Sequence, residues 1–116
     1  MNQQFEIREY TEGGRSPFAD WFDGLDPVTA ARVRRFIGRL EVGNFGAAKF
    51  LRDGVFELRL DFGPGYRVYF GRKGQTVIIL LGGGSKRRQE ADIAAAVNRW
   101  KRYLEILKQY GADTKL

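Results

Sequence analysis

Residues 55–70 read Val-Phe-Glu-Leu-Arg-Leu-Asp-Phe-Gly-Pro-Gly-Tyr-Arg-Val-Tyr-Phe, and this stretch decides the fold class of the chain. Apolar residues stand at every second position of its first half, with charged residues between them. Side chains alternate between the two faces of a β-strand, so the pattern is typical of a strand with one buried face. We therefore predict a β-hairpin whose strands, 55–62 and 66–70, are joined by a three-residue Gly-Pro-Gly turn.

The polar face of this hairpin has two interpretations. A three-residue turn would place Asp61 opposite Arg67 and Arg59 opposite Tyr69. One interpretation is an ordinary solvated face with a cross-strand Asp61–Arg67 ion pair, worth about 0.2–1 kcal/mol. The other is a binding surface on which the guanidinium groups of Arg59 and Arg67 hold a phosphate. The pattern alone leaves both open.

Two helix starts precede the hairpin. Ser16-Pro17 and Asp26-Pro27 each combine a capping side chain with a proline at the first helical position. The first start predicts a short helix that ends near Gly24. After the second start, apolar residues at positions 33, 36, 37 and 40 fall on one face of a longer helix.

Strands and one more helix complete the pattern. Residues 5–10 alternate like a half-buried strand, and residues 76–81 are almost wholly apolar, which is typical of a strand buried on both faces. An apolar stripe from 93 to 107 has helical spacing. The predicted order is β-α-α-β-β-β-α, an α+β fold with helices packed on one sheet.

The segment from Gly82 to Arg88 concentrates glycine and positive charge. Three consecutive glycines between a strand and a helix would let the backbone approach a ligand closely, and a helix start offers free N–H groups to an anion. Lys86, Arg87 and Arg88 then occupy the predicted first turn, where the helix dipole disfavours each cation by about 0.3–1 kcal/mol. Either the segment binds an anion or it is a solvated basic helix start.

Composition limits the possible chemistry. The chain has 116 residues with 20 Lys+Arg, 14 Asp+Glu, a formal charge of +6, no His and no Cys. We expect one domain over residues 1–116. The two missing residue types exclude disulfides, thiolate nucleophiles, His-based triads and sites built from Cys or His ligands. The charge favours an anionic partner.

Location is predicted from two absences in the sequence. Residues 1–10 contain no apolar run of signal-peptide type, and the longest apolar stretch, 77–81, is too short to span a bilayer. We therefore expect a cytoplasmic protein with no membrane partner.

Four linked motifs indicate a resemblance to a known family. They are Leu-Glu-Val-Gly-Asn-Phe-Gly at 40–46, Gly-Val-Phe-Glu-Leu-Arg-Leu at 54–60, Gly-Pro-Gly-Tyr-Arg-Val-Tyr-Phe at 63–70 and Leu-Leu-Gly-Gly-Gly-Ser-Lys at 80–86. With Gln89, Asp92-Ile93 and Ala96 after them, these motifs resemble the RelE/ParE superfamily of toxin–antitoxin toxins. The likeness is greatest to its small HigB-like branch of addiction module killer proteins, and it covers roughly residues 18–100.

This resemblance implies helices on a curved, mostly antiparallel sheet and a toxin that cleaves mRNA on the ribosome without metal or cofactor. The substrate's own 2′-hydroxyl attacks the neighbouring phosphate, which leaves a 2′,3′-cyclic phosphate and a 5′-hydroxyl end. The implied protein partner is a cognate antitoxin of helix-turn-helix type, encoded by a neighbouring reading frame.

Carried over by position, the resemblance makes Arg67 the arginine that stabilises the transition state, and it makes Arg59 and Arg87 further catalytic basic residues. Glu57 stands where relatives have a lysine, so it is either the general base or the partner of Arg59. Ile93 stands where relatives have a tyrosine. Further contacts to RNA phosphates are expected from Lys86, Arg88, Lys49 and Tyr69.

Two other functions stay open at this point. ParE-like relatives share the fold but inhibit gyrase without cleaving RNA, and an inactive relative kept for binding would look the same in sequence. A basic RNA-binding module without catalysis is the third possibility, although the polar face offers no run of aromatic residues for base stacking. Fold alone does not decide among them.

Overall fold

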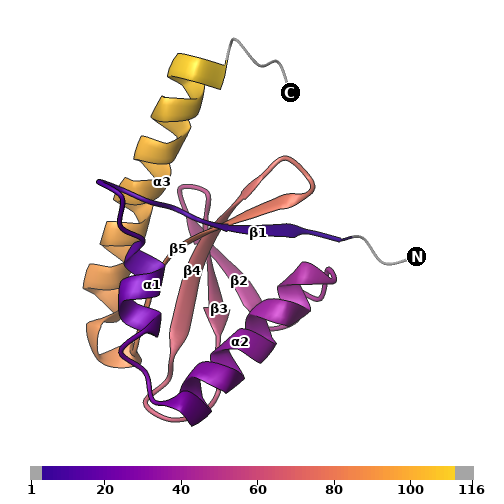
Figure 1. Cartoon of the computed structure of the whole chain (residues 1–116), viewed down its shortest axis with the longest axis vertical. Coiled ribbons are helices and arrows are strands. Elements are labelled where there is room, and N and C mark those ends of the chain that lie inside the picture. Colours follow the sequence, from indigo (N-terminus) through magenta and orange to yellow (C-terminus); the bar gives the residue numbers. More distant parts are fainter. Residues whose placement is uncertain (1–3, 112–116) are drawn as a thin grey trace.

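The computed structural model describes residues 4–111, and Figure 1 shows their arrangement. The predicted α+β class is confirmed, and one strand is added to the predicted order. The elements are β1 (Glu6–Glu9), α1 (Pro17–Phe22), α2 (Pro27–Glu41), β2 (Ala48–Arg52), β3 (Val55–Arg59), β4 (Arg67–Lys73), β5 (Val77–Gly84), a short 3₁₀ turn η1 (Lys86–Arg88) and α3 (Gln89–Gly111).

The five strands form one sheet in the order β1-β5-β4-β3-β2. β1 pairs in parallel with β5, whereas the other three pairs are antiparallel. The expected mostly antiparallel sheet is therefore confirmed. β5 lies inside the sheet, as its apolar sequence predicts, and its Ile78, Ile79, Leu80 and Leu81 are all buried.

Both predicted helix caps are present. The Ser16 hydroxyl accepts a hydrogen bond from the Ala19 backbone N–H at 3.0 Å, and the Asp26 carboxylate accepts one from the Thr29 N–H at 3.1 Å. Each cap satisfies an N–H group that the first helical turn leaves without a partner. None of the helices within residues 4–111 is long and apolar enough to cross a membrane.

The edge strand β2 was not predicted from the sequence. Its neighbouring residues Lys49 and Phe50 are both exposed, so no alternation of apolar and polar residues marks it as a strand. The strand forms because it pairs with β3, and the Phe50 and Phe56 rings meet edge to face with 5.3 Å between their centroids. Its stability comes from this tertiary pairing rather than from a local pattern.

The predicted hairpin register is wrong: β3 is shifted by two residues relative to β4. Arg59 lies opposite Arg67, and Glu57 lies opposite Tyr69, so no Asp61–Arg67 pair closes the turn. A longer loop is the reason: the Leu60 N–H donates to the Tyr66 carbonyl at 3.0 Å, which places five residues rather than three in the connection. The loop is filled by contact between the Phe62 and Tyr66 rings, whose centroids lie 5.6 Å apart.

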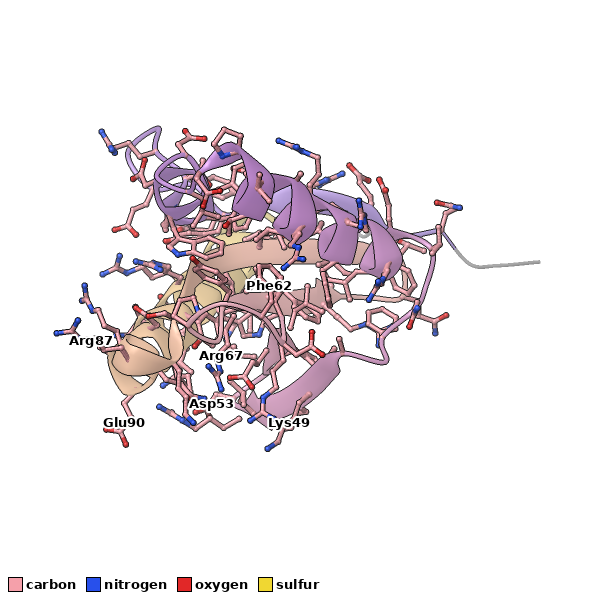
Figure 2. The ribbon with its side chains drawn as sticks, turned by 90° about the horizontal axis from the view of Figure 1, so that it is seen from below. Lys49, Asp53, Phe62, Arg67, Arg87 and Glu90 are labelled. Carbon is pink, nitrogen blue, oxygen red and sulfur yellow. The ribbon has the colours of Figure 1, made fainter. Side chains whose placement is uncertain are left out.

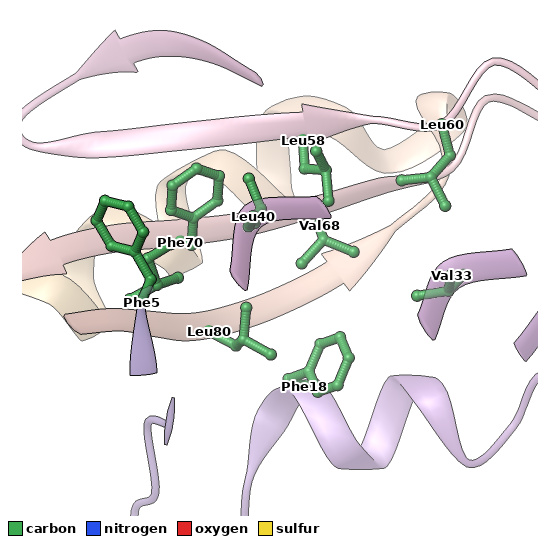
Figure 3. Close-up of a cluster of buried hydrophobic side chains, with 10 residues drawn as sticks. Phe5, Phe18, Val33, Leu40, Leu58, Leu60, Val68, Phe70 and Leu80 are labelled. Atoms are coloured by element: carbon green, nitrogen blue, oxygen red, sulfur yellow. The ribbon is translucent and has the colours of Figure 1, made fainter. Parts of the chain in front are cut away.

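The sheet has a hydrophobic core on each face, because α2 and α3 lie on opposite sides of it (Figure 1). Figure 3 shows the core under α1 and α2, which includes Phe18, Val33, Leu40, Leu58 and Phe70. The core under α3 consists of Tyr10, Val55, Tyr69, Ile79, Leu81, Ala96, Val97 and Trp100.

The three glycines that follow Leu81 belong to β5 rather than to the expected loop. Side chains of the covering helices occupy the space that a side chain at each of these glycine positions would need. A Cβ on Gly83 would lie 2.2 Å from the Trp21 ring of α1, and one on Gly84 would lie 2.0 Å from the Asp92 carboxylate of α3. Close helix packing therefore explains these glycines, and the expected approach to a ligand is wrong.

Trp100 packs against another glycine of the sheet. A Cβ added at Gly71 in β4 would lie 2.4 Å from Cζ3 of the Trp100 ring, which is itself buried in the core under α3. A side chain at position 71 would therefore displace the Trp100 indole.

We expect Gly71→Ala to lower the free energy of unfolding by about 1–3 kcal/mol, because the new methyl group overpacks the Trp100 contact. Gly38→Ala is the matched control: its Cβ would meet nothing within 4 Å in α2, and alanine favours a helix by about 0.5–1 kcal/mol. Urea unfolding curves measure both. Equal stability of the two variants would contradict the packing described here.

Candidate functional site

A buried carboxylate lies at the centre of the polar residues on the α3 side of the sheet. Glu57 in β3 is 0% exposed, and both of its oxygens accept hydrogen bonds. Oε1 accepts from Nε of Arg67 and from Nε2 of Gln89, each at 3.1 Å. Oε2 accepts from Nε of Arg59 at 3.0 Å. One side chain therefore joins β3, β4 and the start of α3.

These contacts favour the role of ion-pair partner for Glu57 over that of general base. A buried carboxylate is tolerated when charges and hydrogen bonds compensate it, and here two guanidinium groups do so. Oε1 already accepts two hydrogen bonds, and Oε2 is buried beside the Arg59 guanidinium, which favours the ionised carboxylate. The structure thus gives Glu57 the task of positioning Arg59 and Arg67.

Arg67 is held on two sides. Its side chain is only 8% exposed; Nε donates to Glu57, and Nη1 donates to the Gly65 carbonyl at 2.8 Å. A guanidinium carries five N–H groups, and two of those of Arg67 are used in these bonds. Because both bonds fix the plane of the group, Arg67 has the preorganised geometry that recognition of a phosphate needs.

The open side of these residues is a shallow hollow of about 300 Å³. Lys86 reaches it from η1, whose backbone is joined to the hairpin loop by a 3.3 Å hydrogen bond from the Lys86 N–H to the Pro64 carbonyl. Arg59 enters from β3 with its side chain 55% exposed. We call this hollow the arginine hollow; it is lined by Arg59, Leu60, Asp61, Gly65, Tyr66, Arg67 and Lys86.

Two of the predicted basic residues lie outside the arginine hollow. Arg87 and Arg88 line a neighbouring hollow on the other side of η1, together with Lys86. Figure 2 shows Arg87 pointing outward at the rim of the molecule, away from Arg67. Lys86, Arg87 and Arg88 form a 3₁₀ turn ahead of α3, so they do not occupy the first turn of the long helix as their sequence predicts.

The other two expected RNA contacts are placed very differently. Lys49 is exposed on the edge strand β2 and lines a separate hollow that also includes Arg59. Tyr69 is only 1% exposed and belongs to the core under α3. Its place on the polar side of the hairpin suggested a surface residue, but α3 covers that part of the sheet. The expectation that Tyr69 touches RNA from the surface is therefore wrong.

The sequence did not predict the roles of two polar side chains of the site, Gln89 and Asp61. Gln89 lies 32 positions from Glu57, so nothing local in the sequence links them, although Gln89 follows the fourth motif. Asp61, expected to pair with Arg67, instead stands as the carboxylate that lines the arginine hollow.

Burial shifts two titratable groups behind the arginine hollow. Burial raises the pKa of Asp92, and the positive charges of Arg88 and Arg99 oppose that shift. The pKa of Tyr69 is raised well above its ordinary value, first by burial and then by the negative charges of Glu57 and Asp92. The Tyr69 hydroxyl makes no hydrogen bond to any residue between 4 and 111.

We expect Glu57→Gln to lower the free energy of unfolding by about 3–5 kcal/mol, because it leaves the Arg67 charge buried without its counter-charge. Asp20→Asn is the control, since it breaks the exposed Arg15–Asp20 pair and should cost less than about 1 kcal/mol. Chemical unfolding at pH 7 measures both. A Glu57→Gln protein as stable as Asp20→Asn would show that the buried pair is not needed.

We expect Tyr69→Phe to raise the free energy of unfolding by about 1 kcal/mol at pH 7, because it removes a buried hydroxyl without a partner. The gain should grow above pH 10. The unfolded tyrosine ionises there while the folded one, with its raised pKa, stays protonated, so the wild type loses stability with rising pH. Unfolding titrations between pH 7 and 11 measure this. A less stable variant at pH 7 would contradict it.

Comparison with known proteins places the chain in a family. Residues 20–101 match the family model described as phage derived protein Gp49-like (DUF891). An uncharacterized protein of Haemophilus influenzae is 45% identical over 80 residues, which cover 68% of this chain and 81% of that protein. The matched region contains α2, the hairpin, the arginine hollow and most of α3. The chain therefore belongs to the Gp49-like family (DUF891), a toxin-like family related to the RelE/ParE-type toxins of toxin–antitoxin systems.

Proposed function

We propose that this protein is the toxin of a type II toxin–antitoxin module, of HigB-like type, and that it cleaves mRNA on the ribosome in the cytoplasm. The observation that carries the proposal is the pair of arginines, Arg59 and Arg67, fixed by the buried Glu57 carboxylate beside Lys86. Family membership supports a toxin, and this cluster supports a phosphate as its target.

In the proposed reaction the scissile phosphate lies in the arginine hollow. The 2′-hydroxyl oxygen attacks the adjacent phosphorus, the bond from phosphorus to the 5′-oxygen breaks, and a 2′,3′-cyclic phosphate and a 5′-hydroxyl result. Negative charge develops on the non-bridging oxygens, and fixed cations stabilise that charge without having to reorganise. Arg67 is the best placed for this task because two bonds already fix its plane.

The attacking hydroxyl must also lose a proton. Glu57 is buried and bonded to three donors, whereas Asp61 lines the hollow with an exposed carboxylate. We therefore assign proton acceptance to Asp61 and positioning of the arginines to Glu57. The leaving 5′-oxygen takes up a proton in turn, and we assign this donation to the Lys86 ammonium group, which lines the hollow.

The proposed module includes an antitoxin encoded by a neighbouring reading frame. Its task would be to cover the basic residues of the arginine hollow, and the formal charge of +6 suits an acidic partner. We place Arg87 and Arg88, which line the neighbouring hollow, among the residues that contact RNA flanking the scissile phosphate or the antitoxin.

We expect Arg67→Lys to reduce cleavage by about 10²–10³-fold, because one preorganised donor to the transition state is lost while the positive charge is kept. Wild type and variant are expressed in a bacterium without the antitoxin, and transcript 5′ ends are mapped by primer extension. Arg59→Ala and Asp61→Asn should also slow cleavage, and both residues are exposed, so these variants test the site even if Arg67→Lys is unstable.

Lys101→Ala on α3 is the matched control, because that lysine is exposed and lines none of the hollows described here. It should cleave as the wild type does. If transcripts stay intact and the purified protein inhibits DNA supercoiling by gyrase, the protein is a ParE-like inhibitor rather than a nuclease. If wild type and Arg67→Lys arrest growth equally and neither produces new transcript 5′ ends, the proposed reaction is contradicted.

A further inference from the structure

The arginine hollow opens into a longer groove along α2. A second hollow, of about 300 Å³, lies between α2 and the loop that joins β3 to β4, and a third, of about 760 Å³, lies between α2 and the β2 edge of the sheet. Asp61 lines all three hollows, and Arg59 lines both the arginine hollow and the largest one. The three hollows therefore meet at Asp61, and two of them also at Arg59. We call the second and third together the α2 groove, with Arg32, Arg35, Arg39, Lys49 and Arg59 as its basic lining residues.

The charge of this groove is poorly compensated. Asp61 is the carboxylate among its lining residues, and none of the ion pairs found within residues 4–111 involves Arg32, Arg35 or Arg39. Other exposed arginines do have carboxylate partners: Arg8 with Glu6, Arg15 with Asp20, Arg52 with Asp53 and Arg102 with Glu12. Uncompensated cations along a concave surface attract an anionic chain.

Aromatic rings hold two of these guanidinium groups. Arg39 lies 4.4 Å above the centroid of Phe36, and Arg32 lies 4.7 Å above that of Phe62. The two rings are themselves neighbours, with 6.3 Å between centroids, and Figure 2 shows Phe62 beneath α2 on the face seen from below. A guanidinium lying on a ring keeps its outer face available, and nucleic acid bases stack on such planes.

The spacing of the arginines fits a chain of phosphates. Arg32, Arg35 and Arg39 are three and four positions apart, so they lie on one side of α2 and extend about 10 Å along its axis. This row leads from the arginine hollow, where Arg59 and Asp61 are shared, to Lys49 on the edge strand.

We propose that the α2 groove binds the backbone of single-stranded RNA that continues from the scissile phosphate. The proposal rests on the proposed function for the identity of the strand. An acidic peptide would also meet the charge, but the guanidinium groups stacked on Phe36 and Phe62 favour a ligand with flat bases. Binding to RNA and binding to an acidic peptide give different results in the following test.

The test measures affinity without cleavage. A fluorescently labelled 12-nucleotide 2′-O-methyl oligouridylate lacks the attacking hydroxyl, and its binding is followed by anisotropy over a range of salt concentrations. Each phosphate contact in single-stranded nucleic acid contributes about 0.7 to the slope of log K against log salt. We expect Arg35→Ala and Arg39→Ala each to reduce that slope by about 0.7 and the double variant by about 1.4, with weaker binding at every salt concentration.

Arg34→Ala is the matched control, because this exposed arginine is on the same helix but lies over Phe22, outside the groove. Its slope should equal that of the wild type. Lys49→Ala, on a different element, should behave like the groove variants even if changes in α2 disturb folding. Unchanged slopes in the groove variants, or equal losses in Arg34→Ala, would overturn the proposal.

A labelled deca-glutamate peptide provides the second arm. If the groove variants lose peptide binding but keep the RNA slope, the groove is a protein-docking surface and the RNA proposal fails. The outcome is separate from that of the nuclease test. Arg67-dependent cleavage with unchanged slopes would remove the groove proposal alone, and reduced slopes without any cleavage would remove the nuclease alone.

Discussion

The structure depends on the contact between the Glu57 carboxylate and the Arg67 guanidinium. Both side chains are almost completely removed from water, so neither charge is tolerable without the other. The same carboxylate also accepts from Arg59 and Gln89, which ties two central strands to the start of α3. The fold therefore fixes the direction of the arginines through an interaction that is costly to disturb.

Local sequence signals were sufficient to predict much of the fold. Ser16 and Asp26 cap their helices through bonds to residues three positions ahead, so short-range patterns were enough to locate α1 and α2. β5 was recognised because four consecutive apolar residues need a buried strand. β2 escaped prediction because Lys49 and Phe50 are both exposed, and its formation depends on β3. Edge strands of this kind take their structure from a neighbour rather than from their own pattern.

The candidate site was predictable in its residue types and less so in its geometry. Arg59, Arg67 and Lys86 come together as expected, but Arg87 lies beyond η1 and Tyr69 lies inside the core. The register depended on a loop whose length the Gly-Pro-Gly motif did not reveal, and the Gln89 contact spans 32 positions. Such long-range placements follow from packing of α3 on the sheet, which no local pattern encodes.

The exposed edge strand has a consequence for solubility. β2 presents unpaired backbone groups at the end of the sheet, and Phe50 beside them is 54% exposed, a combination that invites pairing with another chain. Lys49 and Arg52 place positive charges on both sides of that ring within the same strand. Two molecules meeting edge to edge would bring these like charges together. The Lys49 charge in particular has no carboxylate partner among the ion pairs of residues 4–111, so the basic character that suits an anionic ligand also opposes edge-to-edge pairing of the sheet.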